Sequence, residues 1–282
     1  MLMQLRAGQV VVGYSGTVHY RIVRRLGEGG FGVAYEAEEL DREGHLPRAV
    51  CIKVTDDQDR WQSEAYFGRL LRSNRRVIEF FDSFAFRLSR WPERLLNYAL
   101  VLEYAPHGSM DIYLRETGRW PESRAKNEVV GLLKALDDLH RCGIFHRDLT
   151  PMNVLVAKGG RLKLADFGIA QQGLGGKPVP ADFWNYAWVT RGMKNFERRN
   201  WSGPDDVFQM GQVLGVLLYG RGDTRIGARH VKSLNCTDAT KDVIRRSIGP
   251  RPLRYIDALE MLTALQAPPV APAGVLRRRV PA

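Results

Sequence analysis

The stretch HRDLTPMN runs from His146 to Asn153, and the triplet DFG follows at Asp166 to Gly168. An aspartate, an asparagine five positions later and a second aspartate across one predicted hairpin are hard to obtain by chance. The pattern places two carboxylates and an amide within one short stretch of the chain. It predicts the chemical centre around which the other segments are arranged.

Upstream, two strand-like segments flank a glycine-rich run. Tyr20 to Leu26 alternates as a strand does and leads into Gly27 to Gly32, GEGGFG, after which Val33 to Glu38 continues as a second strand. The pattern G-x-G-x-x-G also occurs in dinucleotide-binding folds, but there a helix begins after the last glycine. A hairpin with a glycine-rich tip lets backbone amides lie over phosphates. An ordinary glycine-rich hairpin is the alternative.

A lysine interrupts the next apolar segment, Arg48 to Val54. Lys53 inside a buried strand is costly unless its charge finds partners. Phosphate oxygens and a carboxylate would serve, and Glu64 in the helix predicted over Trp61 to Arg72 is the candidate carboxylate. If Glu64 is instead a solvated helical residue, Lys53 has no visible partner in the sequence.

Further along the chain the pattern changes from strands to helices. Val77 to Phe86 and Tyr98 to Tyr104 are two more strand-like segments, and they complete a mainly antiparallel sheet with one helix. Pro106 to Ser109 reads as a loop, and Pro121 to Cys142 is the clearest helix, with an apolar stripe for the core. The sequence therefore predicts an α+β chain with a small β-rich part and a larger helical part.

The expected division places the small lobe at residues 1–102, with 1–15 as a candidate flexible segment. The helical lobe is expected at 103–266. Residues 267–282 are rich in proline and alanine and carry a run of arginines, which predicts a flexible tail.

The net charge of the chain indicates which classes of binding partner to expect. The formal net charge of +11 favours acidic partners, among them nucleic acid, a membrane surface, an acidic protein or a polyphosphate ligand. The arginines are spread along the chain, however, and the one cluster is Arg277 to Arg279 in the tail. We therefore do not expect nucleic acid as a partner.

The cysteines and the apolar runs point to a cytoplasmic protein without a membrane span. Cys51, Cys142 and Cys236 have no metal-ligand spacing, which predicts free thiols in a reducing compartment. The first two lie in apolar contexts and are expected as buried small hydrophobes. No secretory signal pattern begins the chain, and its longest late apolar run, Val213 to Tyr219, is too short to cross a bilayer.

Taken in order, these motifs resemble those of the eukaryotic-type (Hanks-type) protein kinase family, with this chain as a divergent member, over Tyr20 to Leu265. GEGGFG resembles the glycine-rich loop, VCIK at Val50 to Lys53 the V-A-I-K strand, and HRDLTPMN with DFG the catalytic loop and metal-binding triplet. The resemblance implies a bilobal fold. It also implies that Asp206, in DDVFQMG, hydrogen-bonds the backbone of the catalytic loop.

The implied activity is ATP- and Mg²⁺-dependent transfer of the γ-phosphate to a hydroxyl of a protein substrate, serine or threonine rather than tyrosine. Asp148 would accept or orient the hydroxyl proton. Asn153 and Asp166 would hold Mg²⁺, while Lys53, steadied by Glu64, would contact the α- and β-phosphates. The implied nucleotide-binding residues are Leu26, Gly27, Gly29, Gly30, Gly32, Ala34, Cys51, Lys53, Leu102, Glu103, Ala105, Ser109 and Leu155.

Three departures from the family pattern bear on activity. Thr150 stands where serine/threonine kinases usually carry a lysine that contacts the transferring phosphate, which predicts slow transfer rather than none. Cys51 replaces the usual alanine of V-A-I-K, a small apolar exchange. No A-P-E occurs between Ile169 and Pro204, the segment that seats the peptide substrate in the family. A nucleotide-binding pseudokinase-like scaffold is the alternative function, and a small-molecule phosphotransferase ranks below it.

Arg147 in the HRD triplet implies a partner in the segment after DFG. A phosphorylated hydroxyl is one candidate, with Thr190 preferred over Tyr186 and Ser202. A carboxylate such as Asp182, or a purely structural role for Arg147, is equally compatible with the sequence.

Overall fold

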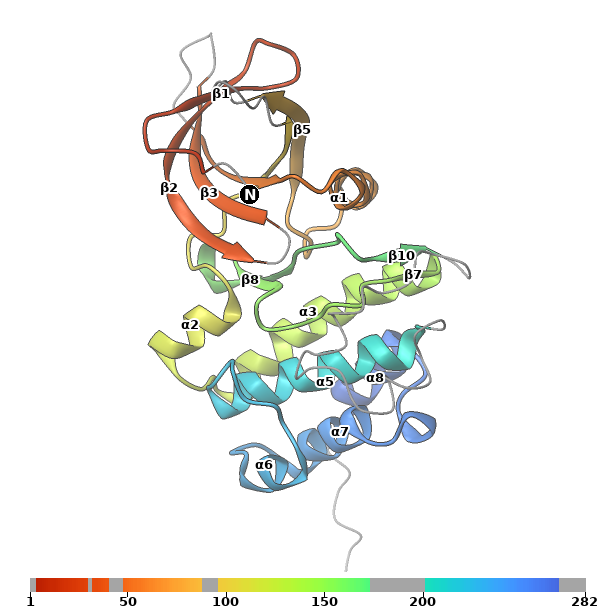
Figure 1. The fold of residues 1–282 in the computed structure, drawn as a ribbon. Coiled ribbons are helices and arrows are strands. Elements are labelled where there is room, and N and C mark those ends of the chain that lie inside the picture. The colour runs from red at the N-terminus through yellow and green to blue at the C-terminus, as the bar shows by residue number, and fades with distance from the viewer. Residues whose placement is uncertain (1–3, 30–31, 41–47, 88–95, 173–200, 269–282) are drawn as a thin grey trace, which may run out of the picture.

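The computed structural model describes residues 4–29, 32–40, 48–87, 96–172 and 201–268, and these form two lobes. The first lobe is built on a sheet and the second on helices, with the first stacked on the second (Figure 1). The predicted α+β, bilobal architecture is confirmed.

The small lobe is built on one antiparallel sheet. Its strands are β1 (Val10–Val12), β2 (His19–Gly29), β3 (Gly32–Leu40), β4 (Arg48–Thr55), β5 (Phe80–Arg87) and β6 (Leu96–Glu103), in the order β1-β2-β3-β4-β6-β5. Because side chains alternate along a strand, Val50, Ile52 and Val54 are buried in the core of the sheet, while Lys53 projects from its other face. Lys53 pairs in register with Ala34 and Leu100, so its backbone lies in the middle of the sheet.

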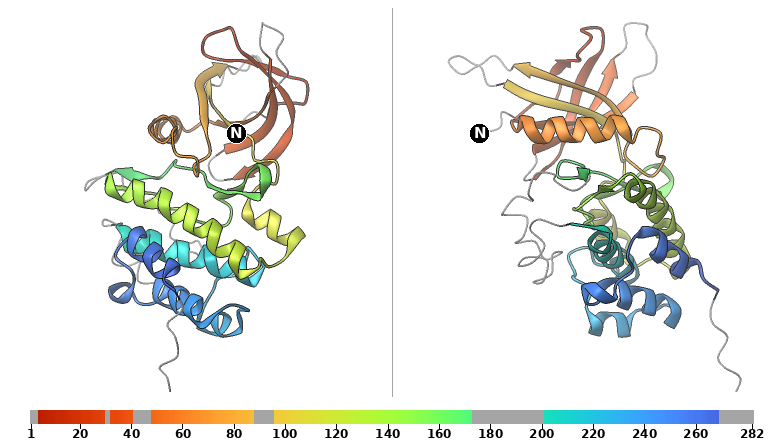
Figure 2. Two further views of the ribbon diagram at one scale, coloured as in Figure 1. Left: turned by 180° about the vertical axis from the view of Figure 1, so that it is seen from behind. Right: turned by 90° about the vertical axis from the view of Figure 1, so that its right-hand side faces the viewer.

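Helix α1 (Gln58–Leu70) packs beside β5 and β6, as the right-hand view of Figure 2 shows. The carboxylate of Asp57 caps its start by accepting from the Arg60 amide at 3.0 Å. The indole of Trp61 donates to the carbonyl of Ala99 at 2.9 Å and ties the helix to the sheet. These contacts bury Glu64 on the side that faces Lys53. At the end of the helix, Leu70 is 48% exposed, whereas the C-cap residue Leu71 packs into the core.

The first strand, β1, has no counterpart among the elements predicted from the sequence. Residues 1–15 are expected to be flexible, yet β1 pairs with β2, and Leu5 and Val11 are buried. The amide of Leu5 donates to the hydroxyl of Tyr35 at 3.0 Å. A strand of three residues has too little sequence for its alternation to be recognised.

The large lobe is mainly helical around α3 and α5. Its elements are α2 (Met110–Thr117), α3 (Glu122–Arg141), β7 (Ile144–Phe145), β8 (Val154–Val156), β9 (Leu162–Leu164), β10 (Gln171–Gln172), α5 (Gly203–Tyr219), α6 (Ala228–Ser233), α7 (Asp238–Ile248) and α8 (Ala258–Gln266). Pro121, expected at the first turn of α3, is its N-cap residue. None of the helices in the described ranges is both long and apolar enough to cross a membrane.

Helix α5 lies almost wholly inside this lobe, between α3, α7 and α8. A capping box of Ser202 and Asp205 begins it, and the left-handed Gly220 ends it. At Gly211 the helix approaches α7 so closely that a Cβ atom there would lie 2.5 Å from Cβ of Ser247. The position of α5 therefore depends on a glycine at this contact.

Replacing Gly211 with alanine tests this packing. In an open helix the change stabilises by roughly 0.5–1 kcal/mol, whereas overpacking costs roughly 1–3 kcal/mol. We expect Gly211→Ala to lower the melting temperature in thermal unfolding. Ser247→Gly should relieve the clash, so the double variant should lose less stability than the sum of the single variants. A raised melting temperature in Gly211→Ala would contradict the contact.

Candidate active site

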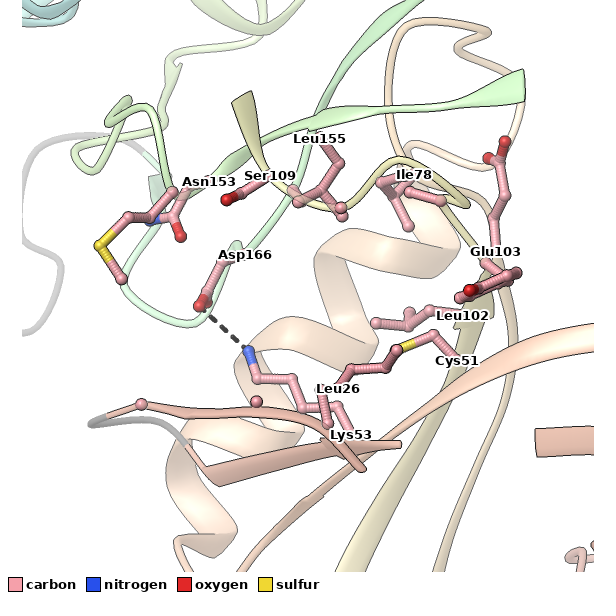
Figure 3. A pocket seen from close by; sticks show the side chains of 18 of the residues that line it. Leu26, Cys51, Lys53, Ile78, Leu102, Glu103, Ser109, Asn153, Leu155 and Asp166 are labelled. Atoms are coloured by element: carbon pink, nitrogen blue, oxygen red, sulfur yellow. Dashed lines mark ion pairs between the residues drawn. The ribbon is translucent and has the colours of Figure 1, made fainter. Parts of the chain in front are cut away.

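A cavity of about 660 Å³ opens between the two lobes. Both lobes supply its walls, with the β2–β3 hairpin on one side and the segments around β8 on the other (Figure 3). A volume of this size suits a drug-sized or nucleotide-sized ligand. Of the residues predicted to bind nucleotide, the cavity is lined by Leu26, Gly27, Gly29, Gly32, Ala34, Cys51, Lys53, Leu102, Glu103, Ala105, Ser109 and Leu155.

Some predicted residues fall outside the described ranges. They are Gly30 of the glycine-rich loop, Tyr186, Thr190 and Asp182 of the segment after DFG, and the Arg277 to Arg279 cluster. Ser202 is described, and its hydroxyl accepts from the guanidinium of Arg251 at 2.7 Å at the start of α5.

Lys53 is held between two carboxylates at the back of the cavity. Its Nζ lies 2.7 Å from Oε2 of Glu64 and 3.1 Å from Oδ2 of Asp166, an ion pair that Figure 3 marks. Burial lowers the pKa of Lys53, but the negative charges of Asp166 and Glu64 raise it by more than burial lowers it. The pKa therefore lies above its ordinary value, and the ammonium group stays charged. The partner that the sequence requires for Lys53 is thus Glu64, joined by Asp166 from the other lobe.

Asp148 and Asn153 face each other within the catalytic loop. The side-chain nitrogen of Asn153, Nδ2, donates to Oδ2 of Asp148 at 2.7 Å and to the backbone carbonyl of Asp148 at 3.0 Å. Burial and the nearby charge of Asp166 raise the pKa of Asp148 to about 7. A carboxylate with a pKa near neutrality is suited to proton transfer.

The oxygen atoms of Asn153 and Asp166 suit a hard divalent cation. Since the nitrogen of the Asn153 side chain is engaged by Asp148, its carbonyl oxygen is the atom left to coordinate a metal. Within the described part of the chain, no group of three or more His, Cys, Asp or Glu residues could hold a metal ion. Two protein ligands fit Mg²⁺, which usually binds one or two carboxylates together with substrate phosphates.

Asp206 at the start of α5 holds the catalytic loop through hydrogen bonds to its backbone. Its carboxylate accepts from the backbone amides of His146 and Arg147, both at 2.9 Å, and from the indole of Trp201 at 2.9 Å. Burial alone would raise the pKa of Asp206, but the hydrogen bond and charge of His140 outweigh it and lower the pKa. The predicted bond from Asp206 to the loop backbone is confirmed.

His146 acts as a brace in this arrangement. Its ring is fully buried and lies 4.6 Å from the ring of Phe167, centroid to centroid. Burial lowers its pKa, which keeps the imidazole neutral. The ring packs against Phe167 and is not among the side chains that line the cavity.

The structure brings Thr150 to the cavity beside Asp148 and Asn153. The carbonyl of Thr150 accepts from the amides of Asn153 at 3.0 Å and Val154 at 3.1 Å, so its backbone shapes the loop. The side chain is 7% exposed and supplies a hydroxyl where the family has an ammonium group. The loop geometry therefore does not depend on the missing cation, although the charge of the site does.

Several lining residues are not found by sequence reasoning. Val77 and Ile78 precede β5, Ile112 lies in α2, and Met152 lies in the catalytic loop. Val77, Ile78 and Ile112 have no motif around them, and Met152 occupies a variable position of HRDLTPMN, so only the three-dimensional fold shows that these apolar side chains line the cavity. Ser109 has a second role that sequence reasoning does not assign, since its hydroxyl caps α2 by accepting from the Ile112 amide at 3.4 Å.

The expectation that Cys51 and Cys142 are both buried is wrong for Cys142. Cys142 caps the exposed end of α3 and is itself exposed, whereas Cys51 is partly buried in the cavity wall. The apolar neighbours of Cys142 in sequence face the core, and the cysteine lies where the helix ends. Burial raises the pKa of Cys51 to about 12.

The cysteines should therefore differ in reactivity. With a pKa of about 12, roughly one Cys51 thiol in thirty thousand is ionised at pH 7.5, and the fraction grows tenfold with each pH unit up to that pKa. Iodoacetamide followed by peptide mass spectrometry should label the exposed Cys142 first and Cys51 much more slowly. Equal labelling rates at pH 7.5 would contradict the burial of Cys51.

Comparison with known proteins agrees with this geometry. The family described as "Protein kinase domain" matches residues 20–236. The chain is 26% identical over 239 residues to the probable serine/threonine-protein kinase zyg-1 of Caenorhabditis elegans, covering 79% of this chain and 32% of that protein. It is 26% identical over 264 residues to CBL-interacting protein kinase 1 of Oryza sativa subsp. japonica, covering 84% of this chain and 53% of that protein.

A bacterial relative is also similar. The probable serine/threonine-protein kinase PknB of Lactococcus lactis is 28% identical over 157 residues, which cover 54% of this chain and 24% of that protein. The chain thus spans only part of the relatives it matches. With the family match over residues 20–236 and Lys53, Glu64, Asp148, Asn153 and Asp166 assembled in one cavity, the chain belongs to the protein kinase family.

Proposed function

We propose that this protein transfers the γ-phosphate of ATP, with Mg²⁺, to a serine or threonine hydroxyl of a protein substrate. The observation that supports it most directly is the convergence of Lys53, Asp166 and the Asp148–Asn153 pair on one cavity. Phosphoryl transfer needs positioned charges more than covalent participation, and these side chains are of that kind. The relatives named serine/threonine-protein kinases favour these hydroxyls over tyrosine.

Each group has a role in the proposed reaction. Lys53 binds the α- and β-phosphates and is kept charged by Glu64 and Asp166. The backbone of the glycine-rich β2–β3 hairpin covers the phosphates, and Leu26, Ala34 and Leu155 enclose the adenine. When bound by Asn153 and Asp166, Mg²⁺ supplies neutralisation of phosphate charge. Asp148 orients the substrate hydroxyl and accepts its proton.

A second candidate, a nucleotide-binding scaffold without turnover, is favoured by one observation. Thr150 brings no positive charge to the loop, and cationic groups near the transferring phosphate stabilise the transition state. Against this reading, the other charged groups of the site are all in place. A small-molecule phosphotransferase would consume ATP without labelling protein, so an assay with radiolabelled ATP and generic protein substrates separates the three functions.

Asp148→Asn should lower phosphate transfer at least about a hundredfold, because the amide cannot accept the hydroxyl proton. Since Asp148 does not hold the nucleotide in this scheme, ATP should raise the melting temperature of the variant and of the wild type by similar amounts. Asp166→Asn is the companion change and should also abolish transfer. Unchanged incorporation of labelled phosphate in both variants would refute the assignment.

Thr150→Lys should raise the turnover number, because a lysine restores a cation next to the transferring phosphate. A gain of about tenfold corresponds to about 1.4 kcal/mol of added transition-state stabilisation. Thr150→Met, which matches the length without the charge, is the control and should show no gain. An equal rate for the lysine variant and the wild type would show that Thr150 does not limit transfer.

A further inference from the structure

Three polar side chains of α5 follow one another along a single side of this buried helix. Asp206, Gln209 and Gln212 are spaced three residues apart, and all are fully buried. Each one hydrogen-bonds the backbone of a segment packed against the helix. Asp206 and Gln209 serve the catalytic loop, whereas Gln212 serves the segment that contains Ile226.

Gln209 contacts the peptide groups on both sides of Asp148. Its Oε1 accepts from the amide of Leu149 at 2.9 Å, and its Nε2 donates to the carbonyl of Arg147 at 3.2 Å. The Arg147 carbonyl belongs to the peptide bond before Asp148, and the Leu149 amide belongs to the one after it. One side-chain amide therefore fixes both peptide groups from which the Asp148 side chain emerges.

The backbone at this point requires such support. Arg147 has a φ angle of 73°, a left-handed conformation that residues other than glycine seldom adopt. Asp206 holds the amide of Arg147 at 2.9 Å while Gln209 holds its carbonyl. The carboxylate of Asp148 is then fixed by Asn153. Other side chains each bond one of the peptide groups that flank Asp148: Asn153 donates to the Asp148 carbonyl at 3.0 Å, and Nδ1 of His146 accepts from the Asp148 amide at 3.4 Å. Gln209 bonds both of these peptide groups, so its loss weakens the support on both sides of Asp148.

We propose that Gln209 is a positioning residue for phosphoryl transfer, because its amide sets the direction in which Asp148 faces the cavity. The inference rests on the proposed function. A glutamine is suited to the task since it carries a donor and an acceptor in one planar group, whereas glutamate only accepts and methionine does neither. Gln209 does not line the cavity, so it acts through Asp148 and not on the nucleotide.

The chain offers a matched control on the same helix. Gln212 accepts from the Ile226 amide at 2.8 Å and donates to the Ile226 carbonyl at 2.9 Å. Gln209→Met and Gln212→Met therefore each remove two hydrogen bonds between a buried side chain and a backbone, at nearly unchanged volume. Both should lower the melting temperature by similar amounts. Assays are run below the lower of the two unfolding transitions.

Only Gln209→Met should impair the reaction. We expect its kcat to fall at least about tenfold with the KM for ATP unchanged, because small misplacements of a reacting group are costly. Gln212→Met should keep the wild-type kcat. Hydrogen exchange should speed up in the peptide that contains Leu149 for the first variant, and in the one that contains Ile226 for the second.

The outcomes separate this inference from the proposed function. A wild-type kcat in folded Gln209→Met, or an equal loss in both variants, overturns the positioning role. Unchanged hydrogen exchange of the Leu149 amide in Gln209→Met would show that Gln209 does not hold the backbone of the loop, and it would overturn the positioning role even if the protein has no activity. A wild-type protein that fails to label any substrate while binding ATP overturns the proposed function, and the positioning role with it.

Discussion

The buried ammonium group of Lys53 constrains the whole molecule. A charged lysine in the middle of a sheet is tolerated only when carboxylates compensate for the lost hydration. Glu64 reaches it from α1 in the small lobe, and Asp166 reaches it from the segment after β9 in the large lobe. Because both carboxylates pair with this one charge, Lys53 ties α1 to the sheet and links the two lobes at the cavity.

On the other side of the cavity, side chains of α5 hold the backbone of the catalytic loop in place. The catalytic loop has an irregular backbone, with φ of 73° at Arg147, and Asp166 beyond it has φ of 63°. Such conformations cost of order 1–3 kcal/mol each and persist only where neighbouring groups hold them. Asp206 and Gln209 hold the loop from inside a helix that is itself packed against α7 at Gly211. The placement of Asp148 thus depends on the packing of the large lobe.

The sequence predicted the parts of the site that carry charge. A lysine in an apolar strand requires a carboxylate partner, which predicted the pair of Lys53 and Glu64. The spacing of Asp148, Asn153 and Asp166 matches a known motif, so the assembly of these residues in one cavity could be predicted. Ile78 and Gln209 could not be found in the same way. An apolar residue at the cavity and a glutamine in a buried helix have no sequence pattern of their own, because their roles arise only from what the fold places against them.

The predictions that were wrong for Cys142 and for the segment of β1 also failed because tertiary contacts have no sequence pattern. Cys142 lies in an apolar stretch of sequence but ends a helix at the surface, and β1 is too short to show alternation. Periodicity reports which face of an element is buried, whereas element ends and short edge strands are decided by tertiary contacts. The small-lobe sheet and helix α3 were long enough for their patterns to be recognised.

A crystal structure with a non-hydrolysable ATP analogue and Mg²⁺ tests the central claim most directly. The phosphates should lie between the β2–β3 hairpin and Lys53, the metal should bind the oxygens of Asn153 and Asp166, and the γ-phosphate should face Asp148. An analogue bound with its phosphates away from Lys53, or a cavity left empty at saturating analogue, would contradict the assignment of this cavity as a phosphotransfer site.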